Sequence, residues 1–422
     1  MKFKNPLSRQ KFYRPTINDV IDGIFEILLY FACFFPFVRV IPTNTDTQPN
    51  AALIAILIII LYWIKDGIQT RKYWIIAVPC VGMGGLALLG IFFDGFSSAF
   101  RSYFSYVSLI CIPLAVLTIM KKRGGLNETL VKVCVWIWFI VGFIQKYYVY
   151  DFGYSILSRH TTGKTRGAVS LATEPSAYGY MCLFMILIVL QMKRQVIFYT
   201  GLLLLQIVVF ASSSVTIVYI GVYVLAYMLN ELFLKKKFAL FKTVGVAGLG
   251  IGGLFAIKRF VPPTNRMGAL VNYLFEEPQK IIEDESIVMR VEAITFSFES
   301  FIENNFMPHG MYTFKIMSGI GGLFYECGFI ALIILVGIGV IIYKGSHRKY
   351  RLMYLLGYMI IMFSSIPFSA PLMCFYLGVC LWSAGVVKEE QQKETVLKNG
   401  GSVMWYHGKI YREIEDEGTV DM

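Results

Sequence analysis

The sequence predicts an all-α integral membrane protein with about twelve transmembrane helices and with one medium and one long helical loop on the outer side. Only 16% of its 422 residues are charged, against about a quarter in a typical soluble chain, and 56% are hydrophobic. Apolar segments of membrane-spanning length recur from residue 22 to residue 387, and basic residues gather in alternate loops between them. These observations exclude a soluble globular protein.

The apolar segments are the predicted transmembrane helices, because about 20 apolar residues are needed to cross the hydrocarbon core. They lie at 22–41, 50–64, 73–93, 103–120, 129–148, 176–192, 196–211, 215–234, 238–257, 319–343, 352–366 and 371–387. The first segment follows a basic N-terminus and precedes no small-residue cleavage site. We therefore expect an uncleaved first helix.

Basic residues predict the orientation of the helices, because cytoplasmic loops carry an excess of lysine and arginine. With the N-terminus inside, the short inner loops hold clusters such as Lys121-Lys122-Arg123, whereas the short outer loops hold only Arg101. Both termini, 1–21 and 388–422, are therefore expected in the cytoplasm, and the polar C-terminal tail is expected to be solvated and partly disordered. The net charge of +12 follows from this topology and requires no nucleic-acid partner.

Cysteines and known catalytic motifs give no sign of a metal or cofactor. The eight cysteines lie within apolar segments and form no CxxC or Cys/His cluster, which favours a packing role. The chain has no P-loop, no H-E-x-x-H and no G-x-S-x-G motif, and the outer loops carry no DxD motif. The run Glu283-Asp284-Glu285 fits a solvated turn better than a divalent-cation site. We therefore predict neither a metal nor a cofactor.

Two outer loops are longer than the rest: 149–175 within the helical region 22–257, and 258–318 before the last helices at 319–387. Long insertions between helices are uncommon unless they are functional. The medium loop places four basic residues within eight positions, on the side where cations are disfavoured: Arg159, His160, Lys164 and Arg166. Gly163 and Gly167 would let backbone amides approach an anion closely. We expect this loop to bind an anion, the alternative being contact with lipid headgroups.

Glu174 and Pro175 follow the basic loop and open the next helix. An acid followed by proline at the first helical position is a common helix start, so Glu174 is a candidate capping residue. A carboxylate at the mouth of a membrane helix is equally a candidate to orient an arginine or to act as a base. The residues alone do not decide between these roles.

The long loop is predicted to contain two helices. Residues 269–286 have the apolar pattern of a helix lying on the membrane surface, and apolar residues from Val288 to Ile302 recur at helical spacing. Arg290 lies near the start of the second helix, and His309 lies just past its end. If that helix folds back over the membrane, both side chains would face a cavity beneath it. Histidine suits proton transfer near neutral pH, although a lone histidine is more often structural.

Three further residues are supporting candidates. Arg39 ends the first helix on the outer side, where its alternative role is to snorkel to the interface. Arg101 shares a short outer loop with Asp94, and the two are candidates to pair with each other. Glu326 is an acid inside a predicted membrane helix, with a functional and a structural role equally open.

Together these features resemble the O-antigen polymerases (Wzy-type) and their relatives, the O-antigen ligases, over roughly residues 20–387. The resemblance rests on helix topology and on short motifs, namely 173–176, 212–214, Arg290 before an Asn-rich turn, and 321–328. The chain departs from the family pattern at 304–310, where the Pro-x-x-Gly-x-Gly turn is absent, and it lacks the Arg-(ten residues)-Gly repeat.

The resemblance implies a membrane-embedded, GT-C-like glycosyltransferase of the bacterial cytoplasmic membrane. It would polymerise undecaprenyl-diphosphate-linked oligosaccharide repeats into O-antigen or capsular polysaccharide at the outer face, by inverting transfer without a metal. Its partners would be the lipid-linked donor and acceptor, the bilayer, and a chain-length regulator and flippase of the same pathway. The implied site residues are Arg166 and Arg290 on the diphosphate, Arg159 and Lys164 assisting, and Glu174 or His309 as the base.

Three other functions compete with this interpretation. An O-antigen ligase would use the same donor and pass the glycan to another acceptor, such as a lipid A core. A flippase of lipid-linked oligosaccharide would place charges and broken helices near the midplane, often in repeated halves. The predicted helix interiors are nearly free of charge and no internal repeat is evident, which favours the polymerase. A scaffolding role for the long loop has the least support.

Overall fold

The computed structural model describes residues 17–40, 48–66, 74–89, 96–158, 160, 167–213, 266–283, 285–310, 316, 318–346, 351–398, 403–406 and 409–412, with single positions between 216 and 259. The first half of the chain forms α1 (Ile17–Phe34), α2 (Asn50–Asp66), α3 (Trp74–Leu89), α5 (Phe96–Arg123), α6 (Glu128–Tyr147), η2 (Tyr154–Ile156), α7 (Pro175–Val189), α8 (Val196–Leu205) and the π-helical η3 (Gln206–Ala211).

The second half forms α11 (Arg266–Glu276), α12 (Gln279–Ile282), α13 (Glu285–Glu303), α14 (Gly319–Cys327), α15 (Ile330–Gly345), α16 (Arg351–Met362), α17 (Pro371–Lys398), β1 (Val403–Tyr406) and β2 (Lys409–Arg412). Strands β1 and β2 pair as an antiparallel hairpin, and the other named elements are helical. The two helices expected in the long outer loop are present as α11 and α13.

Two of the described helical stretches, Ser102–Arg123 and Glu128–Tyr147, are long and apolar enough to cross a membrane by length and composition. The shorter apolar stretches are Asn50–Tyr62, Ile76–Ala87, Pro175–Val189, Val196–Ala211, Ile330–Gly345 and Pro371–Gly385. The expected spans 215–234 and 238–257 lie largely outside the described residues. The helical class is therefore confirmed, whereas the count of twelve spans and the GT-C-like arrangement remain predictions.

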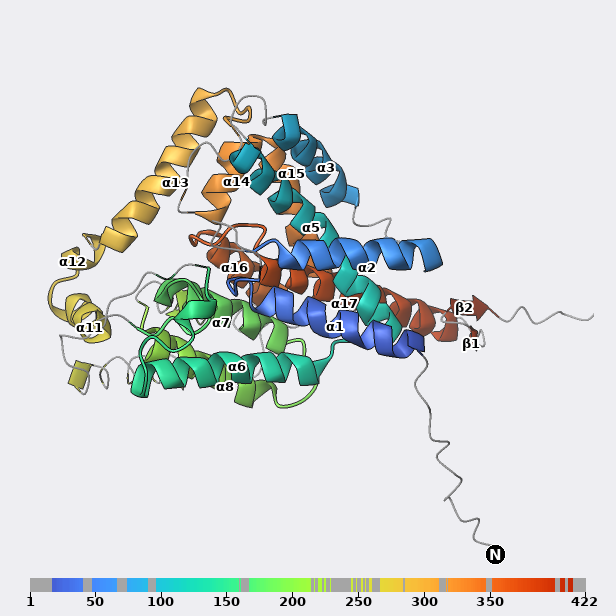
Figure 1. The fold of residues 1–422 in the computed structure, drawn as a ribbon, viewed down its shortest axis with the longest axis horizontal. Coiled ribbons are helices and arrows are strands. Elements are labelled where there is room, and N and C mark those ends of the chain that lie inside the picture. Colours follow the sequence, from blue (N-terminus) through green and yellow to red (C-terminus); the bar gives the residue numbers. More distant parts are fainter. Residues whose placement is uncertain are drawn as a thin grey trace, which may run out of the picture.

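The helices run mainly along the long axis of the molecule, which gives it two distinct ends (Figure 1). The start of α1 and the end of α17 lie at one end, and α11–α13 form an arm at the other (Figure 1). Helix α5 lies at the centre, where it contacts α2, α3 and α17. Gly378 lets α17 approach α5 closely, because a Cβ there would lie 2.6 Å from the Val116 side chain.

The expected single helix 319–343 is interrupted, and this corrects the sequence prediction. Helix α14 ends at Cys327, and Gly328 adopts a positive φ of 55° before α15 begins at Ile330. The chain after α13 packs into the break, where the Phe329 N–H donates to the Phe306 carbonyl at 2.8 Å. A Cβ on Gly328 would lie 2.5 Å from that same carbonyl oxygen, so the break requires glycine.

Two other boundaries differ from the prediction. Helix α1 ends at Phe34 rather than near residue 41, because Pro36 disfavours helical geometry at the residue before it. At the other end of the chain, the tail expected to begin at 388 continues α17 as helix to Lys398 and then forms the β1–β2 hairpin. Helix-forming Glu, Gln and Lys residues extend the apolar helix over 388–398, and the acidic run 413–417 lies outside the described residues.

Candidate functional site

A buried glutamine organises the loop between α6 and α7. The Gln145 amide nitrogen donates to the Phe152 and Ser170 carbonyls at 2.8 and 2.9 Å. Its amide oxygen accepts the Val169 and Ser170 N–H groups at 3.2 and 2.6 Å. One side chain thus satisfies four backbone groups at two points of the loop, which would otherwise be buried without partners. The loop is fixed in shape on both sides of the basic segment 159–166.

The segment of this loop at 167–168 packs against the end of η3. The Ala168 N–H donates to the Phe210 carbonyl at 2.8 Å. A Cβ on Gly167 would lie only 1.8 Å from the Ala211 carbonyl oxygen, so no other residue fits there. Gly167 was expected to bring backbone amides close to an anion. In the structure it allows the chain to approach the end of η3, and its role at an anion stays a prediction.

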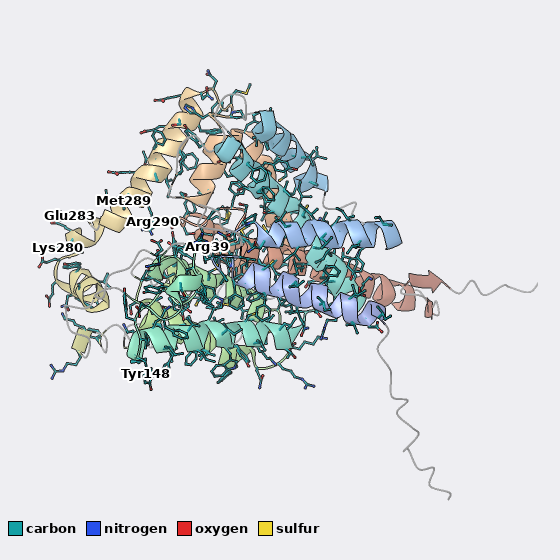
Figure 2. All side chains as sticks on the ribbon, in the orientation of Figure 1. Arg39, Tyr148, Lys280, Glu283, Met289 and Arg290 are labelled. Atoms are coloured by element: carbon teal, nitrogen blue, oxygen red, sulfur yellow. The ribbon has the colours of Figure 1, made fainter. Side chains whose placement is uncertain are left out.

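The near side of the loop pairs with the chain that follows α1. Val38 and Leu157 form an antiparallel bridge, the Arg39 N–H donates to the Ile156 carbonyl at 2.8 Å, and the Ser158 N–H donates to the Phe37 carbonyl at 3.0 Å. Arg39, whose side chain is exposed, therefore lies beside the start of the basic segment. Figure 2 shows Arg39 toward the end of the molecule that carries α11–α13.

Glu174 occupies the position before the first residue of α7, with Pro175 opening the helix as expected. Its half-buried side chain makes no capping hydrogen bond, and it accepts the hydroxyl of Ser176 instead. Glu174 therefore does not cap α7 through a side-chain hydrogen bond. The other interpretation, an acid that orients an arginine or acts as a base, stays open. The carboxylate is held at the start of an apolar helix, where the helix N-terminus favours its negative charge.

Two tyrosines connect the start of α7 with Arg290 on α13 of the arm. Tyr180, one turn and a half into α7, is 0% exposed, and its ring lies 5.6 Å from that of Tyr219. The Arg290 guanidinium lies close enough to interact electrostatically with both hydroxyls, and the Glu174 carboxylate does so with Tyr180. Arg290 lies near the start of α13, at the arm end of the molecule (Figure 2). We call Glu174, Tyr180, Tyr219 and Arg290 the tyrosine–arginine cluster.

The close approach in this cluster depends on Gly179. A Cβ there would lie 2.5 Å from both the Oγ1 and the Cγ2 of Thr216, so glycine lets the helix bearing Tyr219 lie against α7. The Thr216 hydroxyl donates in turn to the Ser213 carbonyl at 3.1 Å, within the expected serine-rich turn. The packing at Gly179 therefore supports the contact between Tyr180 and Tyr219, on the helix that Glu174 precedes.

His309, the other residue considered as the base, contacts α14. Its backbone N–H donates to the Tyr325 carbonyl at 2.9 Å, and its exposed ring lies 4.6 Å from the Tyr325 ring. Tyr325 also stacks on Phe296, nearly two turns beyond Arg290 along α13. The shared cavity expected for Arg290 and His309 stays a prediction, because these ring contacts place His309 beside Tyr325, which packs on the middle of α13.

Glu326 belongs to a separate buried cluster. It accepts the Tyr106 hydroxyl at 2.8 Å, and the same hydroxyl lies 3.0 Å from the Cys327 sulfur. The carboxylate is only 8% exposed, and the hydrogen bond ties α14 to α5. This geometry supports the structural interpretation of Glu326.

The remaining candidates are not placed. Arg159, Lys164 and Arg166 lie outside the described residues, and the side chain of Arg101 does too, although its backbone belongs to α5. Among the described residues, no group of three or more His, Cys, Asp or Glu side chains is arranged to hold a metal ion.

Sequence reasoning missed Gln145, Tyr180 and Tyr219. A usable signal existed for Gln145, because an uncharged amide near the end of an apolar helix needs buried partners. The tyrosines gave no such signal, since they are 2 of 26 in the chain.

Comparison of the sequence with models of known protein families and with curated proteins finds no match.

Proposed function

We propose that the protein is a membrane-embedded polysaccharide polymerase that joins oligosaccharide repeats carried on undecaprenyl diphosphate, at the outer face of the cytoplasmic membrane. The observation that carries the proposal is the tyrosine–arginine cluster, in which Arg290 of the arm interacts electrostatically with the Tyr180 and Tyr219 hydroxyls, and Glu174 at the start of α7 interacts with Tyr180. The proposal extends the helical bundle to twelve transmembrane spans in a GT-C-like arrangement. It places both termini in the cytoplasm, in agreement with the shared end of α1 and α17 (Figure 1).

The proposed reaction is an inverting displacement at the anomeric carbon of the donor glycan. The hydroxyl oxygen of the acceptor repeat forms the new glycosidic bond while the bond to the diphosphate oxygen breaks. The leaving diphosphate gains negative charge, which the Arg290 guanidinium offsets, because arginine stays charged and can bind two phosphate oxygens at once. Arg166, Arg159 and Lys164 would add to this charge from the basic segment.

Glu174 is the proposed base that takes the proton of the acceptor hydroxyl. It is a carboxylate close to the cluster, held in position by Ser176. A base must reach the proton that it abstracts. His309, which packs on Tyr325 instead, is the weaker candidate by this criterion.

The test is the surface glycan of a strain that lacks this protein, with its lipid-linked precursors separated on a gel. Loss of the ladder with a single repeat left on the final outer-surface carrier supports the polymerase. Long chains stranded on undecaprenyl diphosphate would instead mean an O-antigen ligase. Single repeats trapped on the cytoplasmic face would mean a flippase, and the catalytic roles proposed above would then be wrong.

Complementation with variants of this chain sharpens the test. Wild type should restore the ladder, and Glu174→Gln should not, because the amide cannot take the proton. Glu292→Gln, an exposed acid near Arg290 on α13, is the matched control and should restore it. Equal ladders from both variants would exclude Glu174 as the base.

A further inference from the structure

The hydroxyl of Tyr180 lies near charged groups, but no described residue completes its hydrogen bonding. Its oxygen is buried and, within the described part of the chain, makes no hydrogen bond of normal geometry. The Tyr219 hydroxyl lies near enough for a longer polar contact. A buried hydroxyl without a full partner costs folding free energy, and folded proteins keep few of them. Such a group in a charged cluster is therefore a candidate to meet a ligand.

Two other buried tyrosines show what is particular to Tyr180. Tyr178, on the same helix, is equally buried, but its hydroxyl donates to the Gln206 amide oxygen at 2.8 Å. Tyr358 on α16 is buried with an unpartnered hydroxyl, but the side chain that interacts with it electrostatically is Cys374. Tyr180 alone of the three combines an unpartnered hydroxyl with an adjacent arginine.

The neighbours of Tyr180 indicate the chemistry of the missing partner. Arg290 supplies fixed positive charge, and the Tyr180 and Tyr219 hydroxyls are neutral groups that can each donate one hydrogen bond. A cation with two hydroxyl donors suits an anion that has several acceptor oxygens, which is the description of a phosphate group. The Glu174 carboxylate accepts from Ser176, so its hydrogen bond does not occupy the Tyr180 hydroxyl.

We propose that the Tyr180 hydroxyl donates a hydrogen bond to an oxygen of the lipid-linked diphosphate that Arg290 holds, with Tyr219 as a second donor. This assignment rests on the proposed function for the identity of the anion. The proton stays on the tyrosine, so Tyr180 binds and orients the leaving group and is not the base. The site would therefore hold the diphosphate by hydroxyl donors within α7 as well as by cations of the outer loops.

The experiment measures binding of undecaprenyl diphosphate to the full chain in lipid nanodiscs, for wild type, Tyr180→Phe and Tyr358→Phe. Each variant removes one buried, unpartnered hydroxyl oxygen, so the pair is matched in chemistry and burial. Tyr180→Phe should weaken binding about tenfold, as expected for a hydrogen bond to a charged group, without lowering the melting temperature. Tyr358→Phe should bind like wild type.

Equal binding by the two variants would overturn the assignment. A lower melting temperature of Tyr180→Phe would do the same, because the hydroxyl would then have a partner within the protein. Inorganic pyrophosphate should compete for the site, whereas phosphatidylglycerol at the same concentration should not. Displacement by phosphatidylglycerol would show a general headgroup site and would contradict the diphosphate.

The failure of this inference can be distinguished from failure of the proposed function. If undecaprenyl diphosphate binds with the expected dependence on Tyr180 but the chain joins no repeats, the inference stands and the polymerase does not. If the chain joins repeats and Tyr180→Phe elongates them at the wild-type rate, the polymerase stands and the inference does not.

Discussion

The charged side chains at the two ends of the helical bundle have different kinds of partner. At the end where α1 begins, Lys122 lies 3.3 Å from Asp22 and Arg123 lies 2.5 Å from Glu26, so that acids of α1 meet bases of α5. At the arm end, the Glu174 carboxylate accepts a hydrogen bond from a hydroxyl, and Arg290 interacts electrostatically with two tyrosines.

This difference separates charges that stabilise the fold from charges that are available for chemistry. The first end combines its ion pairs with further polar contacts: the Tyr62 hydroxyl donates to Asp22, and the Lys122 ammonium lies 3.8 Å from the centre of the Tyr62 ring. Each of these charges has a partner of opposite sign, although the second Glu26 carboxylate oxygen is buried without a hydrogen-bond partner among the described residues. Among the described residues, the arm end keeps the buried Tyr180 hydroxyl without a hydrogen bond of normal geometry, in electrostatic contact with a cation and a carboxylate. The comparison predicts that substitutions at the arm end change activity and that those at the other end change stability.

The largest effect is expected from Arg290→Ala. Removing a fixed cation from the position where the leaving group gains charge should slow glycan elongation by about a hundredfold or more. The rate of chain elongation by purified protein measures this, with lipid-linked repeats as substrate. Arg290→Lys should recover part of the rate, because it keeps the charge but loses the paired donors.

Lys280→Ala is the matched control for Arg290. Lys280 lies on α12 of the same arm, where its ammonium pairs with Glu277 at 2.5 Å in an exposed position (Figure 2). Its loss should leave elongation unchanged. Equal slowing by the two variants would mean that the arm acts through its overall charge and not through Arg290.

Gln145→Leu should lower both stability and activity. It removes the partners of four backbone groups in the α6–α7 loop, which should cost about 3 kcal/mol of unfolding free energy and displace the residues on either side of 159–166. Thermal unfolding and elongation rate are the two measurements. Gln191→Leu is the control, because the Gln191 amide nitrogen is buried without a hydrogen-bond partner among the described residues. A Gln145 variant as stable as this control would contradict the proposed clamp.

Glu26→Gln should have a smaller effect, confined to stability. The Glu26 side chain is 7% exposed but its partner Arg123 is 48% exposed, so solvent screens the pair and its loss should cost at most about 1 kcal/mol. The folded fraction should elongate glycan at the wild-type rate. A clear loss of elongation with unchanged melting temperature would remove the distinction between the two ends.

The smallest change is expected for His309→Gln. Its ring is exposed and packs on Tyr325, so elongation and its dependence on pH should change little. The pH profile of the elongation rate is the measurement. Loss of the acidic limb in this variant alone would make His309 the base and exclude Glu174, because a general base is inactive when it is protonated.

The helical class, most helix positions and the two helices of the long loop could be predicted from the sequence, because apolar periodicity and Pro175 are local signals. The break at Gly328 could not, since it depends on the Phe306 carbonyl, which is more than 20 positions away in the chain. Gly167 shows the same limit: a glycine indicates a close approach, but the residue that approaches it, Ala211, is set by tertiary packing.

The candidate site could be predicted in part for the same reason. Glu174 and Arg290 were identifiable from their positions, since one precedes an apolar helix that opens with proline and the other lies near the start of a predicted helix in the long loop. Their association with Tyr180 and Tyr219 was not, because tyrosine at an apolar helix position is indistinguishable from a packing residue until its hydroxyl is placed.

The most direct test of the tyrosine–arginine cluster is a double-mutant cycle on the elongation rate of the purified chain, with Arg290→Lys, Tyr180→Phe and both together. Residues that hold one phosphate group should be coupled, so the double variant should be slowed by clearly less than the product of the two single effects. The cycle of Arg290→Lys with Tyr358→Phe should show independent effects. Independent effects of Arg290 and Tyr180 would contradict the account, because the two side chains would then not hold the same group.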